Sequence, residues 1–545
     1  MLRYGAEIQC QDSKMALNIF MRYTRLACFF LLFILLLTSA VPPSWAYESS
    51  SQPYIDRVES RTTEFTLDNG MKFIVMERHQ APIVSFMTYV NIGSAYEEPG
   101  KTGAAHFLEH LAFKGTSRIG TTNYRAEKPW LDRLDRLTEQ MQAVSNPQRP
   151  ESRSASPGSG SPGSAAPGLV QAGNMAKLQQ EFEQAQAKAA GYVKQNEFGQ
   201  IVEQSGGVGL NATTSADATR YFYSFPSNKL ELWMSLESER FLDPVFREFY
   251  EEKEVILEER RMRTDNSPIG KMVEQFLEVA LPDNPYGRPV IGSEADIRSL
   301  TRQDIQRFYQ SYYTPNHIVM AIVGDVNPVE VERLAQTYFS RFKTQSPAPD
   351  LEMVTSAQTE PQEIILRLPT EPWYLEGYRS PGINHPDHAV YQIISGLLTG
   401  GRTARLYQAL VEKNLALTVE ASDGFPGDRY PNLMLIYALT APGSSVEQVA
   451  TALDAEMTRL KTTPVSAEEL DRIKTQARAG LLQTLASNEG MASLLPEYEA
   501  KTGSWRNLYG QLKAIEAVTA EDVQRVAQDL FQPKNLTVGK LLPIN

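Results

Sequence analysis

Apolar residues recur along the chain in two spacings, one typical of strands and the other of helices. Two runs rich in β-forming residues, 62–67 and 71–76, flank the turn Asp68-Asn69-Gly70 and predict a hairpin. The apolar run 83–92 predicts a central strand, and a Gly-rich acidic loop, 93–103, follows it. The folded part of the chain is therefore expected to begin with a sheet.

From residue 127 the apolar spacing becomes helical, and it resumes after a break near residue 175. The break, 145–173, is dominated by Ser, Pro, Gly and Ala, and such a segment buries too little apolar surface to offset the entropy lost on ordering. We predict an insertion at 127–200 that forms a two-helix projection with a disordered tip. A solvated linker is the favoured interpretation of the tip, and a binding role is the alternative.

A Gly-rich stretch, 206–212, leads into 213–225, which is rich in Thr, Tyr and Phe and is predicted to be a strand. At a sheet edge this strand would pair with an extended peptide through its main chain. An interior strand is the alternative, and the sequence leaves both open. Helices are expected at 230–241, 250–263 and 304–313, with a buried strand at 318–323.

A Pro-rich and poorly patterned stretch, 345–361, separates the chain into halves. Beyond it, the order strand, loop, helix, strand recurs at 364–368, 389–398, 406–411 and 433–439. We therefore predict an α+β fold of two related α/β-sandwich domains, each a mainly antiparallel sheet packed with helices. The first domain is expected at 47–345 and the second at 362–545, with a linker at 346–361.

The 545 residues are too many for one hydrophobic core, and the first 46 do not resemble folded protein. Arg22 and Arg25 precede an apolar run, 26–41, and small residues follow it just before Tyr47. This pattern predicts a cleavable signal peptide at 1–46 and export to the bacterial periplasm or out of the cell. Membrane anchoring through residues 26–41 is the alternative.

Both cysteines, Cys10 and Cys28, fall in this leader, so the mature chain is expected to contain no disulfide. Translation starting at Met15 or Met21 would shorten the unusually long leader. The formal charge is −12, without a basic tract, which disfavours a nucleic-acid partner. Contact with a membrane is expected only if the leader stays uncleaved.

The chemistry of the chain centres on His106-Phe107-Leu108-Glu109-His110. At about 100° per residue, His106, Glu109 and His110 project from one face of a helix. Two neutral imidazoles at this spacing suit one zinc ion, and Glu109 is the candidate general base. Two surface histidines on an amphipathic helix are the alternative.

A zinc site with two histidines and an open position commonly takes a carboxylate as its third protein ligand. The segment 251–259 offers five, and Glu252, Val255, Ile256 and Glu259 form one helical stripe that is expected to point inward. We take Glu259 as the ligand and Glu252 as its supporting neighbour. A rival stripe, Glu251, Val255, Glu258 and Met262, carries a further charge at Glu254. A solvated acidic helix is the alternative, and His385 and His388 are expected to be loop residues.

Together these motifs resemble the pitrilysin/insulinase superfamily of zinc peptidases (inverzincins), in its two-domain branch with mitochondrial processing peptidase and bacterial processing proteases. The resemblance implies one zinc ion on His106, His110 and Glu259, with Glu109 as base and Glu252 in support. It also implies that Asn211 and Ala212 lie on the strand that holds the substrate backbone. The matching segments are 106–116, 206–214, 255–259, Pro285-Tyr286, Ile291-Gly292, Gly324-Asp325, Gly400-Gly401-Arg402 and Arg405-Leu406-Tyr407.

Two departures from the family pattern bear on function. The His110 to Glu259 spacing is longer than in relatives, and the projection accounts for it. Active relatives also carry an Arg and a Tyr in a C-terminal domain, and the corresponding stretch here, 410–417, has neither. We therefore expect a zinc endopeptidase for extended peptides or small unfolded polypeptides that forms a hetero- or homodimer with a related subunit supplying the missing pair. A non-catalytic scaffold or peptide-binding subunit of the same fold is the alternative, and a non-peptide esterase is a third class.

Overall fold

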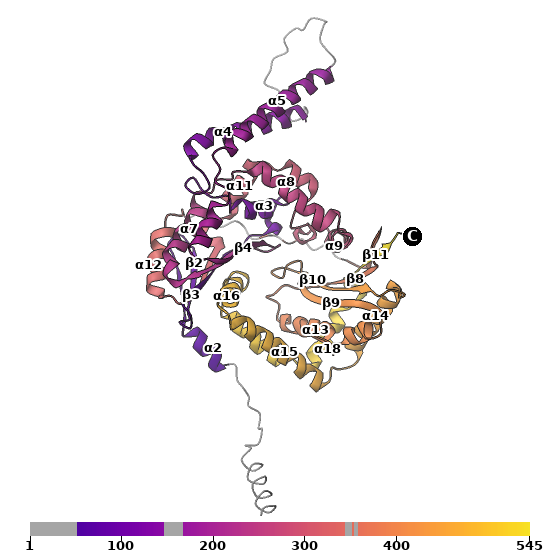
Figure 1. Cartoon of the computed structure of the whole chain (residues 1–545). Coiled ribbons are helices and arrows are strands. Elements are labelled where there is room, and N and C mark those ends of the chain that lie inside the picture. Colours follow the sequence, from indigo (N-terminus) through magenta and orange to yellow (C-terminus); the bar gives the residue numbers. More distant parts are fainter. Residues whose placement is uncertain (1–51, 146–166, 344–350, 352, 354–357, 545) are drawn as a thin grey trace, which may run out of the picture. The chain divides into compact units, whose positions relative to one another are not determined.

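The computed structural model describes residues 52–145, 167–343, 351, 353 and 358–544 (Figure 1). The predicted signal peptide, most of the predicted tip and much of the predicted linker lie outside the described residues. Helix α2 (Gln52–Glu59) belongs to a separate N-terminal unit, whereas the residues from Ser60 onward form one compact unit. The predicted domain limits at 345 and 362 stay predictions.

The first sheet contains the predicted hairpin and the predicted buried strands. Its strand order is β1-β2-β6-β3-β5-β4, antiparallel throughout except that β2 and β6 run parallel. Strands β3 and β6 are central and almost fully buried, as their continuous apolar runs require. The strands are β1 (Thr62–Thr66), β2 (Lys72–Glu77), β3 (Ile83–Val90), β4 (Val208–Thr214), β5 (Thr219–Pro226) and β6 (Ile318–Gly324).

The second sheet repeats the first without its β1. Its order, β7-β11-β8-β10-β9, matches β2-β6-β3-β5-β4, including the parallel pair, which here is β7 with β11. The predicted fold of two related, mainly antiparallel sandwiches is therefore correct. Charges and glycines interrupt β8 and β9, and we did not predict either strand. The strands are β7 (Gln362–Leu368), β8 (Trp373–Ser380), β9 (Ala416–Phe425), β10 (Asn432–Thr440) and β11 (Leu536–Pro543).

Helices pack on the sheets and form one large hydrophobic core in each half. In the first half they are α3 (Ala104–Leu111), α6 (Glu197–Gln204), α7 (Leu230–Leu242), α8 (Phe249–Arg260), α9 (Pro268–Ala280), α10 (Glu294–Ser299), α11 (Arg302–Tyr312) and α12 (Pro328–Phe339). In the second half they are α13 (His388–Thr399), α14 (Val446–Thr462), α15 (Ala467–Leu485), α16 (Asn488–Thr502), α17 (Asn507–Ala517) and α18 (Ala520–Leu530). His388 therefore begins a helix, where a loop was predicted, while His385 lies in a loop.

Each half contributes one helix to the other half's sheet. Helix α16 of the second half packs against β3 and β6 (Figure 1). Helix α9 of the first half packs against β7 and β11, where Met272 and Phe276 join a cluster with Leu375 and Leu541. The interface between the halves is consequently hydrophobic core, which favours a fixed arrangement of the two sheets.

The predicted projection consists of helices α4 (Tyr124–Ser145) and α5 (Pro167–Ala190), which pack against each other (Figure 1). Leu131, Leu134, Leu137 and Phe182 form the apolar seam at its base. Helix α5 begins earlier than predicted, because residues 167–173 are helical instead of belonging to the tip. Proline is well suited to the first turn of a helix, where its missing N–H has no partner to lose.

The predicted strand 213–225 is in fact a hairpin. Residues 215–218 form a tight turn between β4 and β5, in which Ser215 N donates to Ala218 O. Strand β4 lies at the edge of the sheet and β5 lies inside it, between β3 and β4. The two alternatives that the sequence left open therefore apply to two different strands.

Candidate metal centre

Helix α3 is anchored at its N-terminus by a carboxylate from the preceding loop. Gly103 caps the helix with φ 91°, and a side chain there would lie 2.7 Å from Ile291 O. Because Gly103 offers no side chain, Glu97 accepts the free N–H groups of Gly103 and Ala105 at 2.8 and 2.7 Å. Burial raises the pKa of Glu97 to about 8. This arrangement holds fixed the helix that carries the two histidines.

The structure brings His106, His110 and Glu259 together, with one ligand atom from each within 4.8 Å of the others. Glu259 Oε2 lies 3.6 Å from His106 Nε2 and 3.5 Å from His110 Nε2. Ligands about 2.1 Å from a tetrahedral zinc ion are about 3.4 Å apart, so the two separations from Glu259 are close to those of a zinc site. The two nitrogens and one carboxylate oxygen are also the donor set of an open zinc site.

Glu252, paired with Lys114, orients His110 through the ring nitrogen that faces away from Glu259. His110 Nδ1 donates to Glu252 Oε1 at 2.7 Å, and Lys114 Nζ lies 2.6 Å from Glu252 Oε2. With one proton held on Nδ1, Nε2 is the nitrogen that faces Glu259 and His106 and that a metal would bind in place of a second proton. This is the tautomer that a metal ligand needs.

Helix α8 places both acidic side chains, although its inward face differs from the prediction. Glu252 and Ile256 are buried, but Val255 is 52% exposed, so the predicted stripe is wrong at that position. Glu259 is mostly buried and directs its second oxygen, Oε1, to Arg263 at 2.8 Å. Arg263 belongs to a π-helical turn that follows α8, and it leaves only Oε2 of Glu259 facing the histidines.

Glu109 lies on the same helix face and accepts a hydrogen bond from Thr214 Oγ1, at the end of β4. Burial raises the pKa of Glu109, whereas the Thr214 hydrogen bond acts in the opposite direction. A carboxylate with a raised pKa is better suited to take up and release a proton near neutral pH.

The two histidines have opposite electrostatic surroundings. Burial, and then the nearby His110, lower the pKa of His106 to about 4, so His106 stays neutral. Burial also disfavours charge on His110, but hydrogen bonds to Glu252 and Glu259 outweigh it and raise its pKa to about 9. The negative surroundings that favour a proton on His110 also favour a cation bound at its Nε2.

Two family profiles match the chain in succession. The profile described as Insulinase (Peptidase family M16) matches residues 72–127 and 183–294, and the Peptidase M16 inactive domain matches residues 299–477. The chain belongs to the M16 peptidase family. The first match omits residues 128–182, which are most of the projection, so the projection is an addition to the common M16 fold.

Relatives of this M16 chain are named as zinc proteases. Zinc protease PqqE of Helicobacter pylori is 26% identical over 90% of this chain and 94% of its own length. An uncharacterized zinc protease of Mycobacterium tuberculosis is 27% identical over 86% of this chain and 90% of its own. The crystal structure of a protease from Helicobacter pylori has a TM-score of 0.71 at 26% identity and covers 88% of this chain and 99% of that one.

The periplasmic protease PqqL of Escherichia coli shares the fold of this M16 chain. Its TM-score is 0.63 at 18% identity, and the match covers 89% of this chain and 48% of that one. Within the described residues, the helices lack the combination of length and apolar character needed to cross a bilayer.

The edge strand β4 of this M16 chain runs beside α3, the helix that carries His106 and His110, and contains Asn211 and Ala212. Asn211 is exposed and Ala212 is buried, as expected for neighbouring residues on a strand. β4 pairs only with β5, so its outer main-chain edge is unpaired within the described residues. Thr214 connects this edge directly to Glu109.

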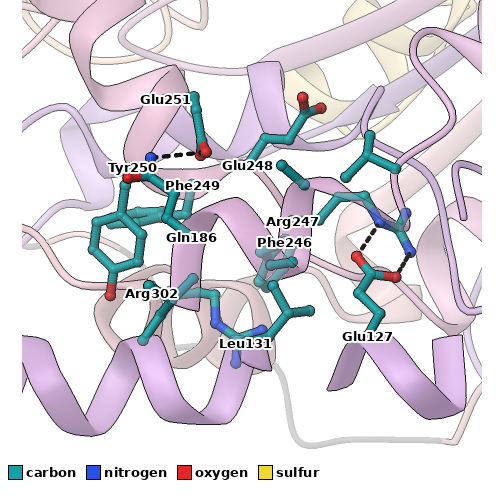
Figure 2. Close-up of a pocket in the computed structure, with 14 residues that line it drawn as sticks. Glu127, Leu131, Gln186, Phe246, Arg247, Glu248, Phe249, Tyr250, Glu251 and Arg302 are labelled. Atoms are coloured by element: carbon teal, nitrogen blue, oxygen red, sulfur yellow. Dashed lines mark hydrogen bonds and ion pairs between the residues drawn. The ribbon is translucent and has the colours of Figure 1, made fainter. Parts of the chain in front are cut away.

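Arg247 joins the base of the projection to the loop that follows α3. Figure 2 shows Arg247 paired with Glu127 of α4, and both side chains are fully buried. Arg247 also donates to the carbonyl oxygens of Lys114 and Thr116, directly after α3. The adjoining cavity, of about 20 Å³, has room for little more than one water molecule and is no peptide site.

Sequence reasoning missed several residues that surround the predicted ones. Lys114 lies one turn beyond His110, a spacing that predicts a shared helix face. Thr214 is the last residue of the segment 206–214, which already matched the family pattern. Glu97 and Arg263 gave no signal, because acidic loops and arginines near a helix end are common on protein surfaces.

Proposed function

We propose that this chain is a zinc endopeptidase that hydrolyses extended peptides or small unfolded polypeptides. The observation that carries the proposal is the convergence of His106, His110 and Glu259 next to a carboxylate, Glu109, that is not needed as a ligand. The zinc proteases among its relatives support the same chemistry.

Residues of the chain account for the proton transfers of peptide hydrolysis. A zinc ion at this site would supply Lewis acidity, which makes water more acidic and a peptide carbonyl more electrophilic. Glu109 takes a proton from the attacking water and delivers it to the leaving amine, while Thr214 holds the carboxylate in place. One such ion satisfies the donor set.

The unpaired edge of β4 supports an extended substrate. A peptide that adds to this edge would hydrogen bond through its main chain, so binding would depend little on its sequence. Asn211 and Ala212 would lie along it, within a few residues of Thr214 and therefore of Glu109.

A related second subunit would complete the site. Of the predicted hetero- and homodimer, the heterodimer is favoured, because a second copy of this chain would lack the same Arg and Tyr. The stretch 410–417 runs from a helical turn, Tyr407–Val411, into β9 and contains neither the Arg nor the Tyr of active relatives. The second half matches the Peptidase M16 inactive domain, which is consistent with a non-catalytic role for this half. The periplasmic PqqL structure and the predicted signal peptide support an exported enzyme.

The test measures zinc content and peptide cleavage on the same preparations. The mature chain is purified from its host alone and with whatever protein remains bound, then assayed on a quenched-fluorescence peptide library. We expect cleavage that a chelator abolishes and added zinc restores.

Glu109→Gln is expected to bind zinc normally and lose cleavage by at least about a hundredfold, because general bases contribute roughly 10²–10⁴ to the rate. Glu258→Gln removes an exposed carboxylate from α8, the helix that carries Glu259, and is the control. A zinc-loaded complex that cleaves nothing would instead indicate a non-catalytic scaffold.

A further inference from the structure

A group of charged residues, two buried and two partly buried, lies where the two halves of the chain meet. It consists of Asp217 from the β4–β5 turn, Asp428 from the loop before β10, and Glu497 and Lys501 from α16; we call it the inter-half cluster. Asp217 is 2% exposed and Lys501 is 7% exposed. Burying charges is costly unless each is paired, so their positions are closely specified.

Asp217 accepts hydrogen bonds from both halves. Tyr286 of the first half donates its hydroxyl to Asp217 Oδ1. The backbone N–H groups of Asp428 and Arg429 donate to Asp217 Oδ2 at 3.0 and 3.2 Å. Tyr430 N donates in turn to the Tyr286 hydroxyl at 3.3 Å. One carboxylate thus joins the turn to a loop of the second sheet.

Lys501 balances the acidic side chains of the cluster. Its Nζ donates to Glu497 at 2.7 Å, contacts Asp428 and lies 3.7 Å from Asp217 Oδ2. Arg220, at the start of β5, pairs with Glu497 at 2.9 Å. Burial opposes the charge on Lys501, but the neighbouring acidic groups more than compensate and raise its pKa. Helix α16 therefore contacts the turn at Asp217 and strand β5, just beyond the turn, at Arg220.

The opposite side of the turn is held by the loop after β3. Ser94 N and Ala95 N donate to the carbonyl oxygens of Ser215 and Ala216 at 3.1 and 3.0 Å. The approach is so close that a side chain at Gly93 would lie 2.3 Å from Ser215 O. The turn is clamped between the two halves and has little freedom to shift.

Thr214 connects this clamped turn to the candidate base. It is the last residue of β4 and directly precedes the turn, and its Oγ1 donates to Glu109 Oε2. A hydroxyl can hold its hydrogen-bond partner in one orientation only if the backbone that carries the hydroxyl is itself fixed. The contacts of Asp217, three residues further on, fix that backbone.

We propose that the second half, whose described residues contribute no ligand to the candidate metal centre, positions the general base of the first half through Asp217. Asp217 is a positioning residue: it secures the β4–β5 turn, so that Thr214 holds Glu109 toward the metal site. The inference rests on the proposed peptidase function and extends it, because it assigns the metal-free half a role in the hydrolysis step.

If Asp217 had a purely structural role, Asp217→Asn would cause the same loss with and without Thr214. A double-mutant cycle with Thr214→Val therefore distinguishes a structural role from the proposed positioning role. Asp217→Asn keeps the size of the side chain but leaves an amide NH₂ facing an N–H or O–H donor. If Asp217 acts through Thr214, kcat in Asp217→Asn falls about tenfold to a hundredfold, as small displacements of catalytic groups do, with KM changed much less. In a Thr214→Val background, Asp217→Asn then causes no further loss.

Tyr286→Phe is the milder second variant, should Asp217→Asn fold poorly, because it removes only one donor to Asp217. We expect a smaller fall in kcat of the same kind, absent again in the Thr214→Val background. Lys72→Met is the matched control. Lys72 pairs with Glu499 of α16 at 2.6 Å, so this substitution removes a different contact between the halves. Its kcat is expected to equal that of the unchanged protein.

Zinc content and hydrogen exchange provide readouts that do not depend on activity. Zinc content should be unchanged in every variant, and amides of residues 213–218 should exchange faster in Asp217→Asn and Tyr286→Phe but not in Lys72→Met. An unchanged kcat in both variants would overturn the inference, as would an equal loss with and without Thr214. Failure of the proposed function is distinguished by the unchanged protein itself, which would then cleave no peptide.

Discussion

Replacing Glu252 with Gln tests whether Glu252 orients His110 for metal binding. In the structure, Glu252 Oε1 accepts from His110 Nδ1 at 2.7 Å and Oε2 accepts from Lys114 at 2.6 Å. A glutamine offers only one oxygen. If the oxygen serves His110, the amide NH₂ meets the ammonium group of Lys114, and if it serves Lys114, the NH₂ meets the His110 N–H.

Either orientation costs one favourable contact at a largely buried position. Changes to groups that orient a ligating histidine reduce metal affinity by about 10–100-fold, or about 1.4–2.8 kcal/mol. The same reasoning applies to a second change. In Glu252→Gln with Lys114→Met, no cation competes for the amide oxygen, so zinc affinity is expected to recover in part.

Zinc affinity is measured by competition with a chromophoric chelator at constant pH, with thermal unfolding recorded for each variant. Glu254→Gln removes an exposed charge from the same helix and is the control. The reasoning is refuted if Glu252→Gln binds zinc within about twofold of Glu254→Gln. The role given to Lys114 is refuted if the double variant binds no better than Glu252→Gln.

Two further predictions concern pH and stability. Glu109 must be ionised to accept a proton, and its pKa is raised by burial, so kcat/KM should rise with pH through an ionisation above the usual range of glutamate. Thr214→Val removes a hydrogen bond that lowers this pKa and should move the acidic limb to higher pH; a limb that does not move would contradict this role of Thr214. Leu495→Ala empties a fully buried position on α16 and should reduce the free energy of unfolding in urea by about 2–5 kcal/mol. Val329→Ala, at a position 76% exposed, is the control, and equal unfolding midpoints for the two variants would show that α16 contributes little to the core.

Local patterns predicted the elements whose signal lies within a few residues. The hairpin at β1 and β2, the strand β6 and the helix carrying His106 and His110 each follow from adjacent residues. The position of Glu259 beside the two histidines could be predicted because an open zinc site usually takes a carboxylate as its third protein ligand, and only five carboxylates lie in 251–259. Val255 was misplaced because an apolar residue on a short helix does not show which neighbour covers it.

Relations between distant parts of the chain were not accessible in the same way. The tight turn at 215–218 contains no glycine or proline, so the end of β4 and nearly all of β5 were predicted as one strand. By sequence, Asp217 is an ordinary turn residue. Its proposed positioning role depends on contacts with Tyr286, Asp428 and Lys501, which are far from it along the chain. Strand β8 carries Glu376, which is buried because Tyr374 and Tyr378 both donate to it.

The exchange of α9 and α16 between the sheets makes the halves dependent on each other for solubility. A fragment ending in the linker would leave β3 and β6 bare on one face, and the complementary fragment would lack the cover of β7 and β11. The half that contributes no ligand to the candidate metal centre is therefore needed to cover the core of the half that carries it.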